Sequence, residues 1–246
     1  MSPATSAAAI TAGIAVGPWL RGLVFAHAVG FGQPHRTRCP HCGHTAVTVA
    51  ANGLLAYGPW DGRCRTCASL IGPPPGPVEL AAAVLLAMAA TYAPSPWVAA
   101  AWSWTALFGV ALAWIDTTVH RLPDILTNAA TAGALSLLAV AAFTTGSHRD
   151  FVSAAVGAAG LGVIGYALTL VASLGRGDAQ LSIAIGLCVG WTGPAAIITA
   201  VASSVLLAAT SVVIQLATRR IRHTDPVALG PFLLAGAVLG IATTIN

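Results

Sequence analysis

Two aspartates stand out in a sequence that contains only seven acidic residues. Asp116 ends a long uncharged run in LAWIDTTVHRLPD, and Asp178 closely follows another such run in LGRGDAQ. Carboxylates at the edge of an apolar segment are costly and are usually retained for function. If the fold brings the two together away from bulk water, they share a proton, because neighbouring like charges cannot both ionise comfortably. One can then act as base on a water while the other protonates a carbonyl oxygen or a leaving amine.

The glycines that flank Asp178 suit the same chemistry. Gly175 and Gly177 allow the backbone to bend sharply, and they permit an extended peptide to come close because no Cβ is in the way. The residues alone leave a second interpretation open, since a carrier also uses carboxylates at membrane depth to bind its coupling ion. The aspartates are therefore candidates either for a proteolytic dyad or for an ion site.

Four of the five cysteines form two CxxC pairs, in CPHCGH and in CRTC, with 21 residues between them. This spacing is typical of a tetrathiolate zinc site, in which two tight knuckles each offer two thiolates to one ion. The predicted ligands are Cys39, Cys42, Cys64 and Cys67. Disulfides or redox pairs are the alternatives, but disulfides do not persist in a reducing cytoplasm. His41 and His44 are expected to be bystanders beside a complete cysteine set, and Cys188 to be a small buried apolar residue.

The composition shows what kind of protein must position these residues. Hydrophobic residues make up 57% of the chain and charged residues 7%, and the mean hydropathy is +0.82. This leaves too little polar surface for a soluble globule. We therefore expect an all-α polytopic membrane protein, and the abundance of Ala and Gly predicts helices that approach closely through small residues. Nucleic-acid binding is not expected.

Crossing the hydrocarbon takes about 20 apolar residues. Spans are expected near 9–29, 78–95, 97–115, 125–143, 151–173, 181–191, 193–217 and 227–245. The sixth is short and ends at GWTGP, so the total is eight if it spans and seven if it is re-entrant. The predicted division of the chain is a first transmembrane helix over 1–29, a tetra-cysteine zinc module over 30–77 and a transmembrane catalytic domain over 78–246.

The arginines predict the orientation, because short cytoplasmic loops carry the excess of positive charge. With eight spans, nine arginines fall on one side and only Arg149 on the other. The nine are Arg36, Arg38, Arg63, Arg65, Arg121, Arg176, Arg219, Arg220 and Arg222. The cysteine module and both aspartates are therefore expected at the cytoplasmic face, with both termini outside. The RRIRH segment at 219–223 is expected to contact anionic lipid headgroups.

Three further carboxylates have simpler expected roles. Asp61, in GPWDG, is predicted to be a turn residue. Glu79 is expected in the first turn of the second span, where it meets the helix dipole, with docking of the cysteine module as the alternative. Asp124, in LPD, is assigned to helix N-capping rather than to catalysis.

The aspartate motifs resemble those of a known family. DTTVHRLPDILT, followed some fifty residues later by GRGD, is similar to the two motifs of the type IV prepilin peptidases, a bacterial family of GxGD-type membrane aspartic peptidases. The cysteine module with the following PVELAAAVLLA resembles the bifunctional members, and DPVALGPFLLAG resembles the closing helix of the family. The motifs occur in the family's order and cover practically the whole chain.

The resemblance implies that Asp116 and Asp178 are the catalytic pair and that the four cysteines bind zinc. It implies cleavage of the leader of a prepilin or pseudopilin, just after a glycine, at the cytoplasmic face of the bacterial inner membrane. Members with the cysteine module commonly also methylate the new N-terminus with S-adenosylmethionine. The rival hypothesis is a non-enzymatic carrier with a zinc-stabilised cytoplasmic cap and ion-binding aspartates. The oligomeric state is not predicted.

The sequence departs from the family pattern at two positions beside these motifs. Gln180 stands where the family usually has lysine, two residues after the second aspartate, so a charge there is absent or comes from Arg176. Leu229 replaces the phenylalanine that precedes the Gly-Pro of the closing helix.

Overall fold

The computed structural model describes residues 3–171, 175–219 and 227–244. Within these ranges the chain is helical apart from the cysteine module and short connections, as expected from its composition. The helices are α1 (Pro3–Ala15), α2 (Gly17–His27), α3 (Pro77–Tyr92), α4 (Pro96–Val119), α5 (Asp124–Thr145), α6 (His148–Val171), α7 (Arg176–Thr192), α8 (Pro194–Ala217) and α9 (Gly230–Thr244). The strands are β1 (Thr48–Val49) and β2 (Ala56–Tyr57), paired antiparallel with Thr48 opposite Tyr57.

The segments expected to span the membrane all contain helices. Five helical stretches are long and apolar enough to cross a bilayer, and they include the continuous Ala7–His27 stretch formed by α1 and α2. The first expected span is thus divided into two helices at Val16, and Pro18 lies in the first turn of α2, where no backbone N–H is needed. The sixth expected segment lies inside α7, a single continuous helix of 17 residues that ends before Gly193. At 1.5 Å per residue α7 is about 25 Å long, a little less than the hydrocarbon thickness.

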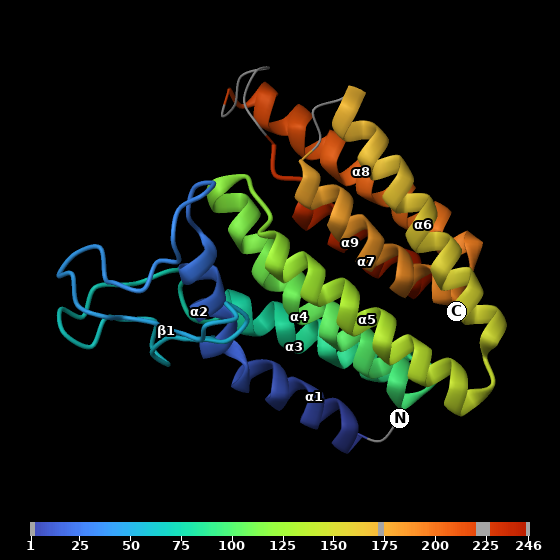
Figure 1. The fold of residues 1–246 in the computed structure, drawn as a ribbon, viewed down its shortest axis with the longest axis horizontal. Coiled ribbons are helices and arrows are strands. Elements are labelled where there is room, and N and C mark those ends of the chain that lie inside the picture. The colour runs from blue at the N-terminus through green and yellow to red at the C-terminus, as the bar shows by residue number, and fades with distance from the viewer. Residues whose placement is uncertain (1–2, 172–174, 220–226, 245–246) are drawn as a thin grey trace.

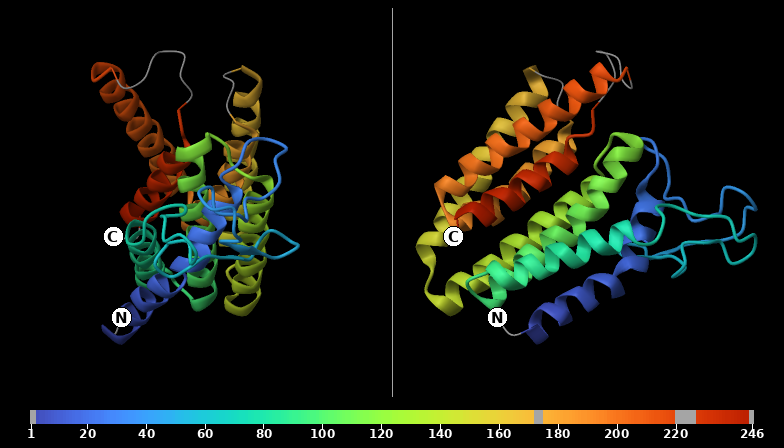
Figure 2. Two further views of the ribbon diagram at one scale, coloured as in Figure 1. Left: turned by 90° about the vertical axis from the view of Figure 1, so that its left-hand side faces the viewer. Right: turned by 180° about the vertical axis from the view of Figure 1, so that it is seen from behind.

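The helices are arranged as neighbouring antiparallel pairs (Figures 1 and 2). α4 packs along α5, α6 along α7, α8 along α9, and α1 along α3, while α7 and α9 also contact each other and α4. Small residues permit the closest approach, as the sequence predicted: a Cβ at Gly186 would meet the Gly157 carbonyl oxygen at 2.6 Å. Large apolar side chains such as Phe108, Leu112 and Leu181 fill the space between the central helices.

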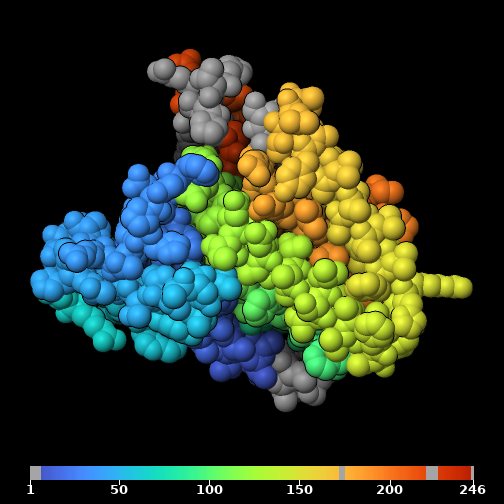
Figure 3. All heavy atoms as spheres, viewed as in Figure 1, coloured from blue at the N-terminus to red at the C-terminus, as the bar shows by residue number. Residues whose placement is uncertain are grey.

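The ends that carry the candidate site gather at one end of the bundle. α4 ends there, α5, α7 and α9 begin there, and the cysteine module projects from the same end (Figures 1 and 3). α1 begins and α9 ends toward the opposite end (Figure 1). Arg220 and Arg222, and with them most of the segment expected to contact lipid, lie outside the described residues.

Candidate active site and candidate metal centre

Asp116 lies in the last turn of α4 and is held by the backbone of α9. Ser95 caps α4, which runs uninterrupted from Pro96 to Val119 and ends at His120 in the left-handed conformation. The Asp116 side chain is only 4% exposed, and its Oδ2 accepts a 2.9 Å hydrogen bond from the Gly230 N–H. A Cβ at position 230 would meet Asp116 Oδ2 at 3.1 Å, so a glycine there lets the backbone approach the carboxylate.

Asp178 lies in the first turn of α7, directly after the Gly175 N-cap. Its Oδ1 is buried and has no hydrogen-bond partner in the described part of the chain. Gly177, which precedes Asp178, packs against Leu122 in the loop that follows Asp116, and α4 and α7 contact each other, so the two aspartates lie at the same end of the bundle although 61 residues separate them in the sequence. The fold thus brings together the two aspartates that the sequence singled out.

The two glycines of the second motif serve different local purposes. A Cβ at Gly177 would lie 2.5 Å from the Leu122 Cβ, so this glycine is needed for α7 to pack against the loop between α4 and α5. The room beside Gly177 is therefore filled by the protein itself rather than left open for a peptide. Beside Gly175 the nearest atom is Asp178 Oδ2, at 2.8 Å from the position of a Cβ.

Gln180 fixes α7 against α5 in this chain. The hydroxyl of Thr127, which is fully buried, donates a 2.7 Å hydrogen bond to Gln180 Oε1. The residue that replaces the family lysine therefore joins the two helices that begin beside the aspartates. The expected capping role of Asp124 was wrong: α5 begins at Asp124 itself, Pro123 occupies the N-cap, and no side chain caps the helix.

The four cysteines converge on one point of the module. Each pair forms a tight turn: the Gly43 N–H donates to the Cys39 carbonyl, and the Ala68 N–H donates to the Cys64 carbonyl. The residue after the second cysteine has a positive φ in both turns, 73° at Gly43 and 56° at Ala68. The two knuckles therefore have the same backbone geometry, although only the first has the glycine that this conformation favours.

The sulfur atoms are spaced as a tetrahedral metal ion requires. All four Sγ atoms lie within 4.8 Å of one another, with 3.7 Å between Cys39 and Cys67 and 3.6 Å between Cys42 and Cys64. A zinc–sulfur bond of about 2.3 Å gives tetrahedral sulfur–sulfur edges of about 3.8 Å. The tetra-cysteine cluster could therefore bind zinc. His41 and His44 are exposed and lie outside the cluster, as expected.

Hydrogen bonds prepare two of the thiols for metal binding. The Ser69 hydroxyl and the backbone amides of the first knuckle lower the pKa of Cys39 to about 6. Backbone amides of the second knuckle lower the pKa of Cys64. Although the His44 amide opposes the change, burial and the neighbouring sulfurs raise the pKa of Cys42 to about 12. Without metal the cluster therefore favours some thiolate but not four, which is expected when anions crowd together.

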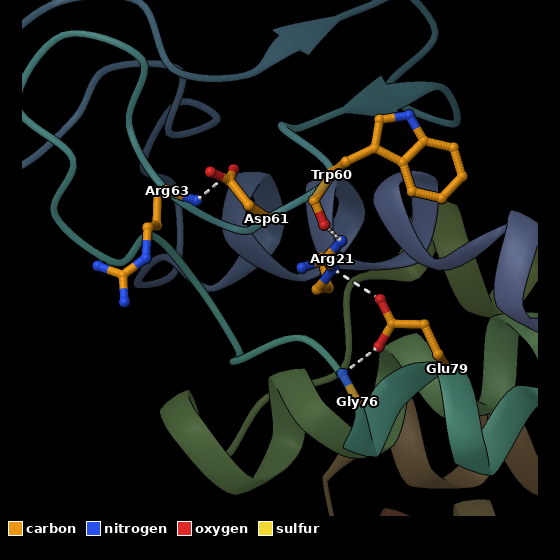
Figure 4. Close-up of polar contacts among 6 residues, drawn as sticks. All are labelled: Arg21, Trp60, Asp61, Arg63, Gly76 and Glu79. Carbon is orange, nitrogen blue, oxygen red and sulfur yellow. Dashed lines mark hydrogen bonds and ion pairs between the residues drawn. The ribbon is translucent and has the colours of Figure 1, made fainter.

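A buried ion pair fastens the module to the helices (Figure 4). Arg21 of α2 is 4% exposed, and its Nε lies 3.0 Å from Oε1 of Glu79 in α3. Arg21 Nη2 also donates to the Trp60 carbonyl of the module, and Glu79 Oε2 accepts the Gly76 N–H at 2.8 Å. Glu79 therefore docks the module, which the sequence offered only as an alternative. The sequence did not predict Arg21 as the partner of Glu79, although an arginine inside the first apolar segment is itself a signal of a buried ion pair.

A second link joins the module to the loop beside Asp116. Arg121 Nη1 donates to the carbonyls of Val29 and Gly30, at 3.1 and 2.8 Å. Elsewhere, Cys188 is buried in α7 as expected, and its thiol donates to the Thr105 hydroxyl at 3.3 Å. Asp61 accepts the Arg63 N–H at 3.1 Å, which confirms its predicted role in a turn.

The fold and the site define a polytopic helical membrane protein with two neighbouring aspartates at one end of the bundle and a tetra-cysteine module beside them. Comparison with known proteins gives the family. Residues 103–213 match the model of the type IV leader peptidase family. A Burkholderia pseudomallei protein (strain K96243) named prepilin leader peptidase/N-methyltransferase is 32% identical over 218 residues, 82% of this chain and 65% of that protein.

Two other relatives carry the same name. The Aeromonas hydrophila protein is 31% identical over 202 residues, which cover 80% of this chain and 68% of that protein. The Dickeya chrysanthemi protein is 27% identical over 212 residues, which cover 84% of this chain and 73% of that protein. The chain belongs to the type IV leader peptidase family. It spans just under two thirds, 65%, of the length of the Burkholderia relative. No solved structure matches it significantly.

Proposed function

We propose that this chain is a membrane aspartic endopeptidase that cleaves the leader of a type IV prepilin-like protein, just after a glycine, at the cytoplasmic face of the bacterial inner membrane. The observation that carries the proposal is that Asp116, in the last turn of α4, and Asp178, in the first turn of α7, lie at the same end of the helix bundle. Family membership and the names of the relatives support the substrate class. The arginine bias of the loops supports the cytoplasmic orientation.

The two carboxyls would divide the acid and base roles. One accepts a proton from the attacking water while the other donates a proton to the carbonyl oxygen, and the tetrahedral intermediate then collapses as the leaving amine is protonated. Asp116 is fixed by the Gly230 N–H, and the buried Asp178 Oδ1 has no hydrogen-bond partner among the residues that the structure describes, so in this proposal it binds a water or a peptide group. In this proposal Gly175 is the glycine at the substrate side of the site.

The cysteine cluster would bind one zinc ion with a structural role. A module with so small an apolar core can take its folding free energy from metal binding. The names of the relatives also favour a second activity, N-methylation of the new N-terminus with S-adenosylmethionine as methyl donor. No described residue is assigned to that cofactor.

Co-expression with a prepilin-like substrate tests the peptidase. Asp116→Asn and Asp178→Asn should each reduce processing at least about 1,000-fold, and the double variant should be no worse, because residues that act as a unit have non-additive effects. Asp61→Asn is the matched control and should process normally. The mature N-terminus is read by mass spectrometry, which also shows a methyl group if one is added. If the unmodified chain leaves the substrate intact, the carrier hypothesis is favoured instead.

A further inference from the structure

A cavity of about 220 Å³ opens between α6, α7, α8 and α9. The apolar groove that contains it is here called the α6–α8 groove. Its lining includes Gly165, Leu168, Ser182, Ser204, Val205 and Phe232. All residues that line the cavity belong to the described part of the chain.

Two residues of the groove lining belong to the segments that hold the two aspartates. Ser182 of the lining is one helical turn after Asp178, and its hydroxyl donates to the Asp178 carbonyl at 2.8 Å. Leu229, also in the lining, directly precedes Gly230, whose N–H binds Asp116. Ser182 is therefore about one turn, or roughly 6 Å, from Asp178 along α7, and Leu229 is adjacent in sequence to the residue that binds Asp116.

The other side of the groove faces outward from the bundle. α6 and α8 pack mainly on α7 and α9 rather than on each other. They diverge toward the end where α7 begins (left view of Figure 2). Large apolar side chains form the rim, and Val205 is 63% exposed. In a membrane this opening faces the lipid, so a bilayer-embedded segment can enter it sideways.

The size and lining of the cavity suit side chains of a helix. A cavity of about 150 Å³ holds a benzene ring, so 220 Å³ accommodates one or two large apolar side chains. This volume is below the range of about 300–1,000 Å³ that is usual for small-molecule sites. The small lining residues Gly165, Ala200 and Ser204 let α6 pack on α7 and α8 pack on α9, so the space for an occupant is bounded by the large apolar residues of the lining.

We propose that the α6–α8 groove receives the apolar helix of the prepilin-like substrate from the bilayer and seats a large apolar side chain from near its beginning in the cavity. The inference rests on the proposed function. It follows from the course of the lining, which runs from the exposed Val205 to Ser182, one turn after Asp178, and to Leu229, which precedes the Gly230 that binds Asp116. The larger cavity of about 700 Å³ between α3, α4, α7 and α9 fits less well. On α7 its lining begins at Ile185, seven residues or about 10 Å after Asp178, whereas the lining of the α6–α8 groove begins at Ser182, four residues after Asp178.

Photo-crosslinking tests the occupant directly and does not require turnover. A photoreactive phenylalanine analogue replaces Val205 in a chain that also carries Asp178→Asn, and the control position is Val213 of the same helix, which is also 63% exposed but lies outside the cavity. We expect at least fivefold more adduct with the substrate helix from position 205. Adducts with lipid alone, or with a second copy of this chain, would contradict the proposal.

Filling the cavity gives a second, functional test. Ala208 lines the cavity, whereas Ala209 beside it is exposed and does not. Ala208→Phe should reduce processing of the membrane-embedded substrate at least tenfold, and Ala209→Phe less than twofold. A short soluble peptide that spans the cleavage site but lacks the apolar helix should be cut equally by both variants. Ala235→Phe, which narrows the larger cavity, should leave processing within twofold.

The outcomes distinguish a failure of the proposed peptidase function from a failure of the groove assignment. If the unmodified chain cuts neither substrate, the proposed function fails and this inference fails with it. If it cuts the membrane-embedded substrate but Ala208→Phe behaves like Ala209→Phe, or Ala235→Phe is the damaging variant, only the groove assignment is wrong. Zinc content and membrane accumulation of each variant show whether it has folded.

Discussion

Replacing Glu79 with glutamine should loosen the cysteine module from the helices. The change leaves Arg21 buried without its counter-charge, although the glutamine oxygen can still accept the Gly76 N–H. Removing one partner of a buried ion pair costs about 3–5 kcal/mol. Because the hydrogen bond to Gly76 is retained, we expect the lower end of this range, a loss of about 3 kcal/mol in docking free energy. This corresponds to roughly a 150-fold change in the equilibrium between docked and undocked module.

The assay is the rate at which purified, zinc-loaded protein transfers its metal to an excess of a coloured chelator. If release requires undocking, Glu79→Gln should release zinc about 100-fold faster than the unmodified chain, in line with the free energy above. Asp61→Asn is the control in the same module, because Asp61 is exposed and accepts only one backbone hydrogen bond. It should change the rate less than about fivefold, since an exposed hydrogen bond contributes at most about 1 kcal/mol.

A double variant separates the ion pair from general damage. In Arg21→Met with Glu79→Leu no charge remains buried, and such apolar replacements are often neutral or stabilising. Zinc release should therefore return to within about tenfold of the unmodified rate. If Glu79→Gln releases zinc as slowly as Asp61→Asn, the module is held by other contacts and the reasoning is refuted.

Three other predictions concern the two motifs. Gly43→Ala should destabilise the module by about 1 kcal/mol, because the left-handed φ of position 43 strains any residue with a Cβ. Ala68→Gly should not destabilise the module, and competition with a chelator for zinc measures both effects. Zinc affinity should rise with pH, because binding displaces protons from the thiols. Above pH 6 the displaced proton is that of Cys42, and below pH 6 a proton of Cys39 is displaced as well. Zinc titrations should therefore show that the affinity depends more steeply on pH below pH 6 than above it. Asp124→Asn should keep processing within twofold, and a loss as severe as that of Asp116→Asn would give Asp124 a direct role in catalysis.

The helical class and the candidate residues could be predicted because their signals are local. Uncharged runs of sufficient length form membrane helices wherever they occur, since the bilayer leaves the backbone no other way to satisfy its hydrogen bonds. The two CxxC pairs likewise predicted the cysteine cluster, because each knuckle is a short turn that places two sulfurs together. The error at Asp124 was also local: a one-residue difference in where α5 begins decides whether a side chain caps the helix.

The contacts between distant segments could not be predicted from such local signals. Nothing near Arg21 in the sequence indicates that Glu79 is its partner, and the Thr127 hydroxyl finds Gln180 only because α5 and α7 pack side by side. The role of Gly177 changed for the same reason, since Leu122 occupies the space that an isolated motif appeared to leave open.

The sequence by itself determined the membrane helices, the metal-ligand set and the identity of the two aspartates, because hydropathy and residue type are properties of short segments. Only the tertiary structure decided that the Gly230 N–H binds Asp116, that a buried oxygen of Asp178 has no hydrogen-bond partner among the described residues, and that Ser182 and Leu229 line a groove between α6 and α8. These features depend on how closely small residues let the helices approach, and that distance is set by all the packed faces together.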